Sequence, residues 1–508
     1  MIEIDGNQLT IDACKKSARE HEPVALSTSG KDAINSSRAR LEKILSKDKP
    51  VYGINTGFGI FADKQILATE SSQLSRNLIL SHAVGTGAPL PDEVVRAAML
   101  VRANTLTKGF SGVREVVVQT LLDMLNRGVT PIVPSQGSLG SSGDLGPLSH
   151  MALVLTRGEP DRESDSGFAE FNRKVVPGKT AMEQAGIERI LLGPKEGLAL
   201  NNGATFSAAI ASLVVWDSEK LLDLAEAALA LSLEALQGCT QAFDPRIHQV
   251  RNHAGQQTVA ANVLKFIEGS TMVNSTLRVQ DAYSLRCAPQ VHGAARDTLN
   301  HAGKVTECEI NSATDNPLIF DPDVALSGGN FHGEPIGLVM DFLGIAMAEI
   351  GAISERRIFR LIDSKLNGGL PPMLVDLPEA AGLNSGLMMP QYTAASLVLE
   401  NQTLATPDSI HSLPTSGDQE DHNANAMTAA RHARQIVDNV AQVIAIELYT
   451  AARALDLRLR QNDGYKMGKG TRQVYDQIRA AVPYQPGDAW WEPEIEKVRV
   501  LLMHIELP

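Results

Sequence analysis

The sequence predicts a mainly α-helical protein, with an elongated central bundle of long helices and a smaller, mixed N-terminal domain. Hydrophobic residues make up 43% of the chain but aromatic residues only 4%, so aliphatic side chains must fill the core, which suits closely packed helices. The first 200 residues mix short strand-like pieces with shorter helices. After Asn202, apolar residues recur at helical spacing over roughly 203–240, 257–270, 281–306, 335–364, 387–404 and 423–457.

The N-terminal part changes character several times along the chain. The first forty residues hold two short strand-like segments and a helix. Helical spacing then runs from Ile66 to about Arg127, interrupted by the breaker stretches GTGAPLPDE and KGFSG. Residues 157–184 are polar and irregular, which favours a surface excursion that contains a hairpin. The composition shifts near residue 200, and we therefore expect domains at 1–200 and 201–508.

Charge and cysteine usage narrow the functional classes. The net charge is −13 without a basic stripe, which argues against nucleic acid or an anionic membrane as partner. The four cysteines are widely spaced, and the N-terminus has acidic residues but no apolar signal segment, so we expect a cytoplasmic protein. The uncharged stretch 197–216 contains Asn, Ser and Thr, and it is predicted to be a buried helix rather than a membrane span.

The stretch GSLGSSGDLGPLSH, residues 137–150, carries an unusual chemical possibility in its backbone. If the amide nitrogen of Gly143 attacks the carbonyl carbon of Ser141, a five-membered ring closes. Loss of water from that ring and from Ser142 leaves a methylidene-imidazolone, an electrophile that no ordinary side chain supplies. Glycine has no Cβ to crowd the attack, Ser142 provides the leaving hydroxyl, and Ser141 contributes only a carbonyl, so its side chain is less constrained. Taken alone, a Gly- and Ser-rich stretch is in most cases a flexible loop.

Eight further motifs accompany this stretch: YGINTGFG (52–59), SHAVGTGAPL (81–90), NTLTKGFSGVR (104–114), EGLALNNG (196–203), QDAYSLRCAPQ (280–290), SGGNFHGEP (327–335), EIGAISERR (349–357) and LPTSGDQEDH (413–422). Together with GSLGSSGDLGPLSH, they resemble the histidine ammonia-lyase branch of the aromatic amino acid ammonia-lyase family over about residues 50–460. The resemblance implies a 4-methylidene-imidazol-5-one formed autocatalytically from Ser141, Ser142 and Gly143. The family triad is Ala-Ser-Gly, so Ser141 is a departure.

Removing ammonia from an α-amino acid requires an electrophile for the amine, a base for the β-proton, a clamp for the carboxylate and a side-chain pocket. By resemblance, Asn202 hydrogen-bonds the ring oxygen and Tyr52, on a Gly-rich loop, is the base. Arg286 is the carboxylate clamp and Tyr283 lines the electrophile; three residues apart, these two share a face if the segment is helical. Gln280 and Phe331 also fall on family site positions. Without the family, a helix cap is the favoured interpretation of Asn202 and a tyrosine packed under a turn that of Tyr52, and Arg286 is just as readily a salt-bridged helix arginine.

The resemblance also bears on the substrate. His82 matches the position that faces the substrate ring, Glu420 would pair with an imidazole N–H, and Met388 matches the histidine branch. These residues favour L-histidine, with urocanate as product. Asn201, where the family more often has an apolar residue, and the residues after Asp421 depart from the pattern. Lyases for tyrosine or phenylalanine, a 2,3-aminomutase and a non-catalytic homologue therefore remain alternatives.

The histidines and the long helices indicate which metals and partners to expect. The spacing of His150, His292, His332 and His422 is unlike that of a metal-ligand set, which favours structural or supporting roles and no metal. The resemblance implies a homotetramer in which each pocket is assembled from three subunits. The long apolar helices after residue 200 agree with such an assembly. The partners expected are therefore an amino acid substrate and further copies of the chain.

Overall fold

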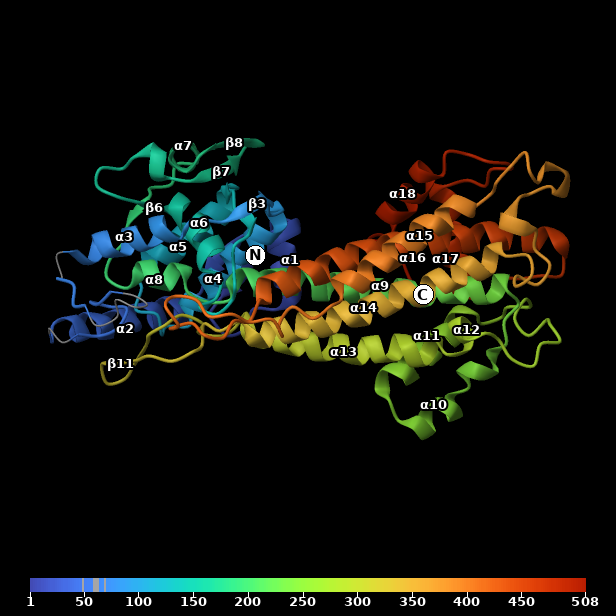
Figure 1. The fold of residues 1–508 in the computed structure, drawn as a ribbon, viewed down its shortest axis with the longest axis horizontal. Helices are drawn as coiled ribbons and strands as arrows, with labels where there is room; N and C mark the ends of the chain where they lie inside the picture. The colour runs from blue at the N-terminus through green and yellow to red at the C-terminus, as the bar shows by residue number, and fades with distance from the viewer. Residues whose placement is uncertain (48–49, 58–63, 68–69) are drawn as a thin grey trace. The chain divides into compact units, whose positions relative to one another are not determined.

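The computed structural model describes residues 1–47, 50–57, 64–67 and 70–508 and divides the chain into two compact units (Figure 1). The single boundary predicted near residue 200 differs from this division, because later segments return to the first unit. Unit 1 comprises 1–216, 302–341 and 407–431, and unit 2 comprises 217–301, 342–406 and 432–508. Four of the points where the chain passes between units lie inside the helices α9 (Thr205–Ala235), α13 (Ala288–Glu309), α14 (Glu334–Ile362) and α16 (Ala426–Gln461).

Unit 1 begins with the small strand and helix pieces that the sequence predicts. Strands β1 (Ile2–Ile4) and β2 (Val24–Leu26) pair in parallel, and α1 (Ile11–Arg19) lies between them in the sequence. The Thr10 hydroxyl caps α1 by accepting a hydrogen bond from the Ala13 amide. The chain continues through α2 (Thr28–Leu45), α3 (Ser71–His82), β3 (Thr86–Pro89), α4 (Asp92–Thr107) and α5 (Glu115–Arg127).

The core of unit 1 forms around α4, which is buried along almost its whole length and packs against α1, α2 and α5. A second cluster joins α3, α6 (Leu145–Leu155) and α8 (Glu196–Asn201), each of which packs against the other two. This second cluster positions part of the site, because five of the predicted residues lie at or beside the ends of its helices: His82, Ser141, Ser142, Gly143 and Asn202.

Unit 1 also contains several short strands. Strands β4 (Thr130–Pro131), β7 (Phe168–Phe171) and β8 (Lys174–Pro177) form an antiparallel sheet, and β7–β8 is the hairpin expected within 157–184. The remaining elements are β5 (Pro134–Gln136), which pairs with β3; β6 (Thr156–Arg157), which pairs with β9 (Ile190–Leu191); the hairpin of β10 (Leu318–Phe320) and β11 (Val324–Leu326); α7 (Gly178–Gln184); and the 3-10 turn η3 (Glu163–Asp165).

Unit 2 is built almost entirely of helices, and the mainly α-helical fold predicted from the sequence is confirmed. Besides its parts of α9, α13, α14 and α16, it contains α10 (Pro245–Arg251), α11 (Ala254–Phe266), α12 (Tyr283–Arg286), α15 (Met388–Leu404), α17 (Lys469–Ala481), α18 (Trp491–Leu501) and the 3-10 turns η4 (Thr240–Phe243), η5 (Pro372–Leu374) and η6 (Pro378–Ala380). The long helices lie within a few residues of the predicted ranges.

One predicted helix, 281–306, is two helices in the structure. The turn α12 ends at Arg286, and α13 starts at Ala288 with Pro289 in its first turn, where the missing amide hydrogen costs nothing. Helix α14 is long and apolar enough to cross a membrane by length and composition. However, 61% of its most apolar 18-residue segment is buried inside the protein, as is usual for a core helix.

Candidate active site

Three packed helices of unit 1 bring their ends to one place. Helix α3 ends at His82, α6 begins two residues after Ser142–Gly143, and α8 ends at Asn201, directly before Asn202. Because α3, α6 and α8 pack against one another, segments from 82 to 202 meet although they are far apart in sequence. The loop that holds Glu420 belongs to the same compact unit.

These helix ends line a cavity of about 1100 Å³. Of the residues that the sequence predicted for the site, the cavity brings together Tyr52, His82, Ser141, Ser142, Asn202, Phe331 and Glu420. The loop 52–59 is described only as far as Gly57; its last two residues lie outside the described part of the chain. The structure therefore assembles the predicted electrophile, base, amide donor and imidazole-recognising residues within one unit.

The backbone around Ser142 is held by the junction between α8 and α9. The Asn202 side-chain amide (Nδ2) donates to the Ser142 carbonyl oxygen at 2.8 Å, and the Gly203 amide donates to the same oxygen at 3.3 Å. The Asp144 amide donates in turn to the Gly203 carbonyl at 2.9 Å. Two donors aimed at one carbonyl oxygen polarise it, as the donors of an oxyanion hole do.

Gly143 is confined by the same junction. Its φ is +75°, and a Cβ built on it would lie 2.1 Å from the Gly203 carbonyl carbon. A side chain at this position would therefore push the paired backbones apart and would also strain φ. The sequence predicted a glycine because a Cβ would crowd ring closure, and the structure adds the close approach of Gly203 as a second reason.

Two buried charged residues that the sequence did not single out support this junction. The Asp144 carboxylate accepts hydrogen bonds from the Ser138 hydroxyl at 2.8 Å and the Ser207 amide at 2.8 Å. Burial raises the pKa of Asp144, while these bonds oppose the rise. Arg102 donates from Nη2 to the Asn202 carbonyl at 2.6 Å, and burial lowers the pKa of Arg102 to about 10. The only local signal was the Asp that follows the Ser-Ser-Gly triplet.

Glu420 contacts both serines of the triplet. Its Oε2 accepts from the Ser141 hydroxyl at 2.6 Å and its Oε1 from the Ser142 hydroxyl at 2.9 Å. The Glu420 main chain is fixed by a pair of hydrogen bonds with Thr415. Burial lowers the pKa of His82, and the negative charge of Glu420 opposes this shift. The cavity thus holds an anionic acceptor and an imidazole near the triplet.

Two histidines assigned structural or supporting roles from the sequence line the cavity themselves. The His332 and His422 rings are stacked with their centroids 5.8 Å apart, and His332 Nε2 lies 3.3 Å from the His422 carbonyl oxygen. They directly follow Phe331 and Asp421, so the motifs NFHGEP and DQEDH contained the signal. Among the described residues, no group of three or more His, Cys, Asp or Glu side chains could hold a metal ion.

Asn201, the departure beside Asn202, does not line the cavity as described. It is fully buried, and its side-chain amide donates to the Ser149 hydroxyl on α6 at 3.2 Å. The residue therefore ties α8 to α6, and its amide group packs behind the site.

The remaining predicted residues form part of unit 2. Arg286 donates a hydrogen bond to the Gln280 side chain, and its guanidinium lies 5.5 Å from the centroid of the Tyr283 ring. Tyr283 and Arg286 share the single helical turn α12, as their spacing predicts. Tyr283 is 72% exposed, and Met388, at the start of α15, is also exposed. None of these four residues is among the described residues that line the unit 1 cavity.

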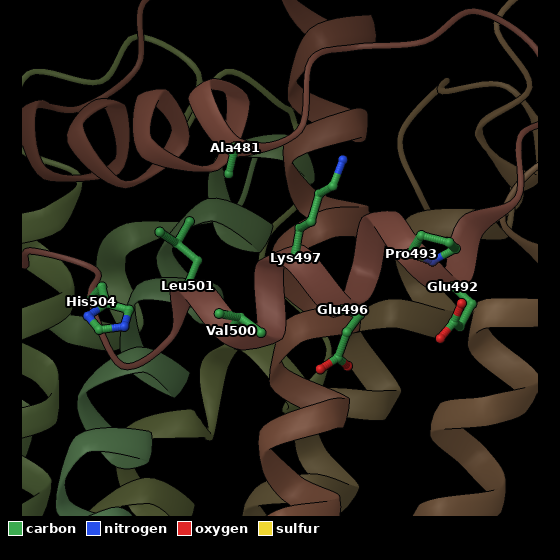
Figure 2. Close-up of a pocket in the computed structure, with 8 residues that line it drawn as sticks. All are labelled: Ala481, Glu492, Pro493, Glu496, Lys497, Val500, Leu501 and His504. Carbon is green, nitrogen blue, oxygen red and sulfur yellow. The ribbon is translucent and has the colours of Figure 1, made fainter.

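A different cavity, of about 520 Å³, lies in unit 2 against α18 (Figure 2). Its lining includes Glu492, Glu496 and Lys497 on α18, with His504 after the helix and Ala481 at the end of α17. It contains none of the residues predicted for the site. The unit 1 cavity is therefore the candidate active site.

Comparisons with known proteins identify the family of the chain. The family model described as aromatic amino acid lyase matches residues 9–480. A histidine ammonia-lyase from Caldanaerobacter subterraneus subsp. tengcongensis is 50% identical over 95% of this chain and 92% of its own length. A histidine ammonia-lyase from Gloeobacter violaceus is 49% identical over 98% of this chain and 95% of its own.

Solved structures give the same result at the level of the fold. A tyrosine aminomutase from Streptomyces globisporus superimposes with a TM-score of 0.92 at 35% identity, over 99% of this chain and 97% of that one. A histidine ammonia-lyase from Trypanosoma cruzi gives 0.89 at 38% identity, over 99% and 93%. The chain belongs to the aromatic amino acid lyase family and is a carbon–nitrogen lyase.

Proposed function

We propose that this chain is a histidine ammonia-lyase that converts L-histidine to urocanate and ammonia, with a methylidene-imidazolone formed from Ser141, Ser142 and Gly143. The observation that carries the proposal is the Ser142 carbonyl, held by Asn202 and Gly203 inside a cavity that also contains Glu420. Overall structure does not separate the candidate activities, because aminomutases superimpose as well as a histidine ammonia-lyase does. Sequence identity favours histidine, since relatives near 50% identity are histidine ammonia-lyases.

The residues around Ser142 fit the prosthetic group. Its carbonyl oxygen would become the ring oxygen, and it already accepts two hydrogen bonds. When formed, the ring supplies an electrophile that captures the substrate amine. Asn202 and Gly203 draw electron density toward the ring oxygen and so strengthen that electrophile. Arg102 holds the Asn202 main chain, which leaves the amide side chain to donate to Ser142.

Substrate recognition and proton removal fall to the other cavity residues. Tyr52 would accept the β-proton at its phenolic oxygen, a role that requires a lowered tyrosine pKa. Glu420 would accept a hydrogen bond from an imidazole N–H, and His82 lies where it can face the same ring. A carboxylate beside the ring suits histidine better than phenylalanine, because the phenyl ring has no N–H or O–H group that could donate a hydrogen bond.

The carboxylate clamp would come from another copy of the chain. Gln280, Tyr283 and Arg286 form one partly exposed group in unit 2 that does not line the described cavity. We place this group, with Met388, in the site of a neighbouring subunit of a homotetramer, where the Arg286 fork can bind the substrate carboxylate. The exposed side chains of Leu338, Phe342 and Ile345 on α14 and of Tyr392 and Leu399 on α15 supply apolar surface for such an assembly. We also propose that the assembled enzyme works in the cytoplasm.

The substrate test uses purified protein with L-histidine, L-tyrosine and L-phenylalanine. Alkene absorbance and free ammonia are followed, and the products are separated to detect a β-amino acid. We expect urocanate and ammonia from histidine, and nearly complete loss of activity in Ser142→Ala, which cannot lose the hydroxyl. A β-amino acid product, or faster reaction with tyrosine than with histidine, would overturn the assignment.

The assembly test mixes two inactive variants. Ser142→Ala removes the electrophile and Arg286→Ala removes the clamp, so each homotetramer is inactive alone. If one site takes these residues from different subunits, co-expression at equal levels restores about one quarter of the wild-type activity, because one site in four then receives both intact residues. No recovery in tetramers that contain both variants would mean that Ser142 and Arg286 serve the same site from one chain.

A further inference from the structure

The Ser141 hydroxyl, which ring formation does not require, makes a specific contact. Ser141 is buried, with 6% of its surface exposed, and its Oγ donates to Glu420 Oε2 at 2.6 Å. The two residues are 279 positions apart, so this contact depends on the tertiary fold. A hydrogen bond to a carboxylate at this distance is charge-assisted and stronger than one between neutral groups.

The two serine hydroxyls have different fates when the ring forms. In ring closure, the Gly143 nitrogen bonds to the Ser141 carbonyl carbon. The Ser141 carbonyl oxygen leaves as water with one proton from each of the Gly143 and Ser142 amides. A second water takes the Ser142 Oγ and its proton together with the proton on the Ser142 Cα. The Ser141 hydroxyl takes part in neither loss and remains on the finished ring.

Glu420 therefore keeps one of its two contacts. The bond from the Ser142 hydroxyl to Oε1 disappears with that hydroxyl, whereas the Ser141 hydroxyl is retained and can still donate to Oε2. Among the described residues, the two serines donate the hydrogen bonds that the Glu420 side chain accepts. The main-chain pairing with Thr415 fixes the backbone but leaves the side-chain torsions to be set by Ser141.

We propose that Ser141 is a positioning residue, which holds Glu420 through Oε2 so that Oε1 stays directed toward the substrate imidazole. This inference rests on the proposed histidine activity and adds a residue to its specificity. An acceptor held in place before the substrate arrives loses less side-chain freedom on binding, so binding is tighter. The triplet then has two functions: Ser142 and Gly143 complete the electrophile, and Ser141 orders the carboxylate beside it.

The test is a double-mutant cycle of Ser141→Ala and Glu420→Gln, with Ser141→Thr as the matched variant that keeps the hydroxyl. Intact mass first establishes that each protein has lost two water molecules, which separates ring formation from positioning. Binding of urocanate, which retains the imidazole, is then measured by calorimetry for all of the variants, and KM and kcat for histidine are measured for the active ones.

If Ser141 acts through Glu420, Ser141→Ala forms the ring, raises KM about 10-fold and changes kcat little, because it removes one hydrogen bond to a charged acceptor. Urocanate affinity falls by a similar factor in the wild-type background and less than about twofold in the Glu420→Gln background. Ser141→Thr binds urocanate more tightly than Ser141→Ala. Equal losses in both backgrounds, or no loss in either, would refute the inference. Wild-type protein that neither binds urocanate nor reacts with histidine would instead refute the proposed function.

Discussion

Glu309, the last residue of α13, provides a quantitative test of the electrostatics around Asp144. Burial raises the pKa of the Glu309 carboxyl from 4.5 to about 7, and the negative charge of Asp144 adds to the rise. Its Oε1 is buried and has no hydrogen-bond partner among the described residues. The folded chain therefore binds this proton more tightly than the unfolded chain does.

This difference fixes the sign of the pH dependence. Between pH 4.5 and about 7 the folded state keeps a proton that the unfolded state has released, so the free energy of unfolding falls as pH rises through this window. At about 1.4 kcal/mol per pKa unit, the total loss is about 3 kcal/mol. Glu309→Gln preserves the shape and cannot ionise, so it should be about 3 kcal/mol more stable than wild type near pH 8 and close to it near pH 4.5.

The assay is urea-induced unfolding of wild type and Glu309→Gln across this pH range. Glu307→Gln is the matched control, because Glu307 is exposed two residues earlier on the same helix. The quantity of interest is the difference between variant and wild type, in which the pH effects of all other groups cancel. A difference that stays constant with pH, or that matches the Glu307→Gln control, would refute a raised pKa at Glu309.

Two further substitutions test the backbone and ionic support of the site. Gly143→Ala places a Cβ against the Gly203 backbone, so intact mass should show no loss of water and activity should fall at least about 100-fold; a dehydrated, active variant would contradict the close approach. The fully buried ion pair of Lys195 and Asp315 predicts that Lys195→Met costs about 3–5 kcal/mol, because it leaves the Asp315 charge unpaired. Lys195→Met/Asp315→Leu should recover much of that loss in thermal unfolding, and a double variant no more stable than the single one would argue against the pair.

Periodicity predicted the long helices because their apolar faces are continuous. It did not predict α17 and α18, whose segments are polar overall. In α17 only Gly470, Thr471, Val474 and Ile478 are buried, a narrow stripe within thirteen residues. The periodicity also did not predict the break between α12 and α13. The apolar spacing continues across Cys287, whereas the helix is interrupted at that residue.

In the candidate site, too, the sequence indicated some residues, whereas others are evident only from tertiary contacts. Motifs pointed to Tyr52, Asn202 and Glu420, and these three residues line one cavity. Arg102 and Asp144 support the site through contacts with Asn202 and Ser207, which are distant in sequence, so spacing and composition gave little indication of their roles. The Ser141 hydroxyl had no evident role in the sequence because its acceptor, Glu420, lies in another segment of the chain.

The junction between α8 and α9 also keeps the Ser142 carbonyl and its two hydrogen-bond donors together. Ser142–Gly143 and Gly203 pair as neighbouring strands do, with Gly203 donating to the Ser142 carbonyl and accepting from the Asp144 amide. Gly203 is itself confined, since a Cβ there would lie 2.6 Å from the Thr314 hydroxyl and 2.9 Å from Arg102 Nη2. Because Arg102 also binds the Asn202 carbonyl, one buried guanidinium limits the position of both donors. The polarity of the Ser142 carbonyl oxygen, which would be the ring oxygen of the proposed prosthetic group, is thus set by contacts that the core of unit 1 provides before any substrate binds.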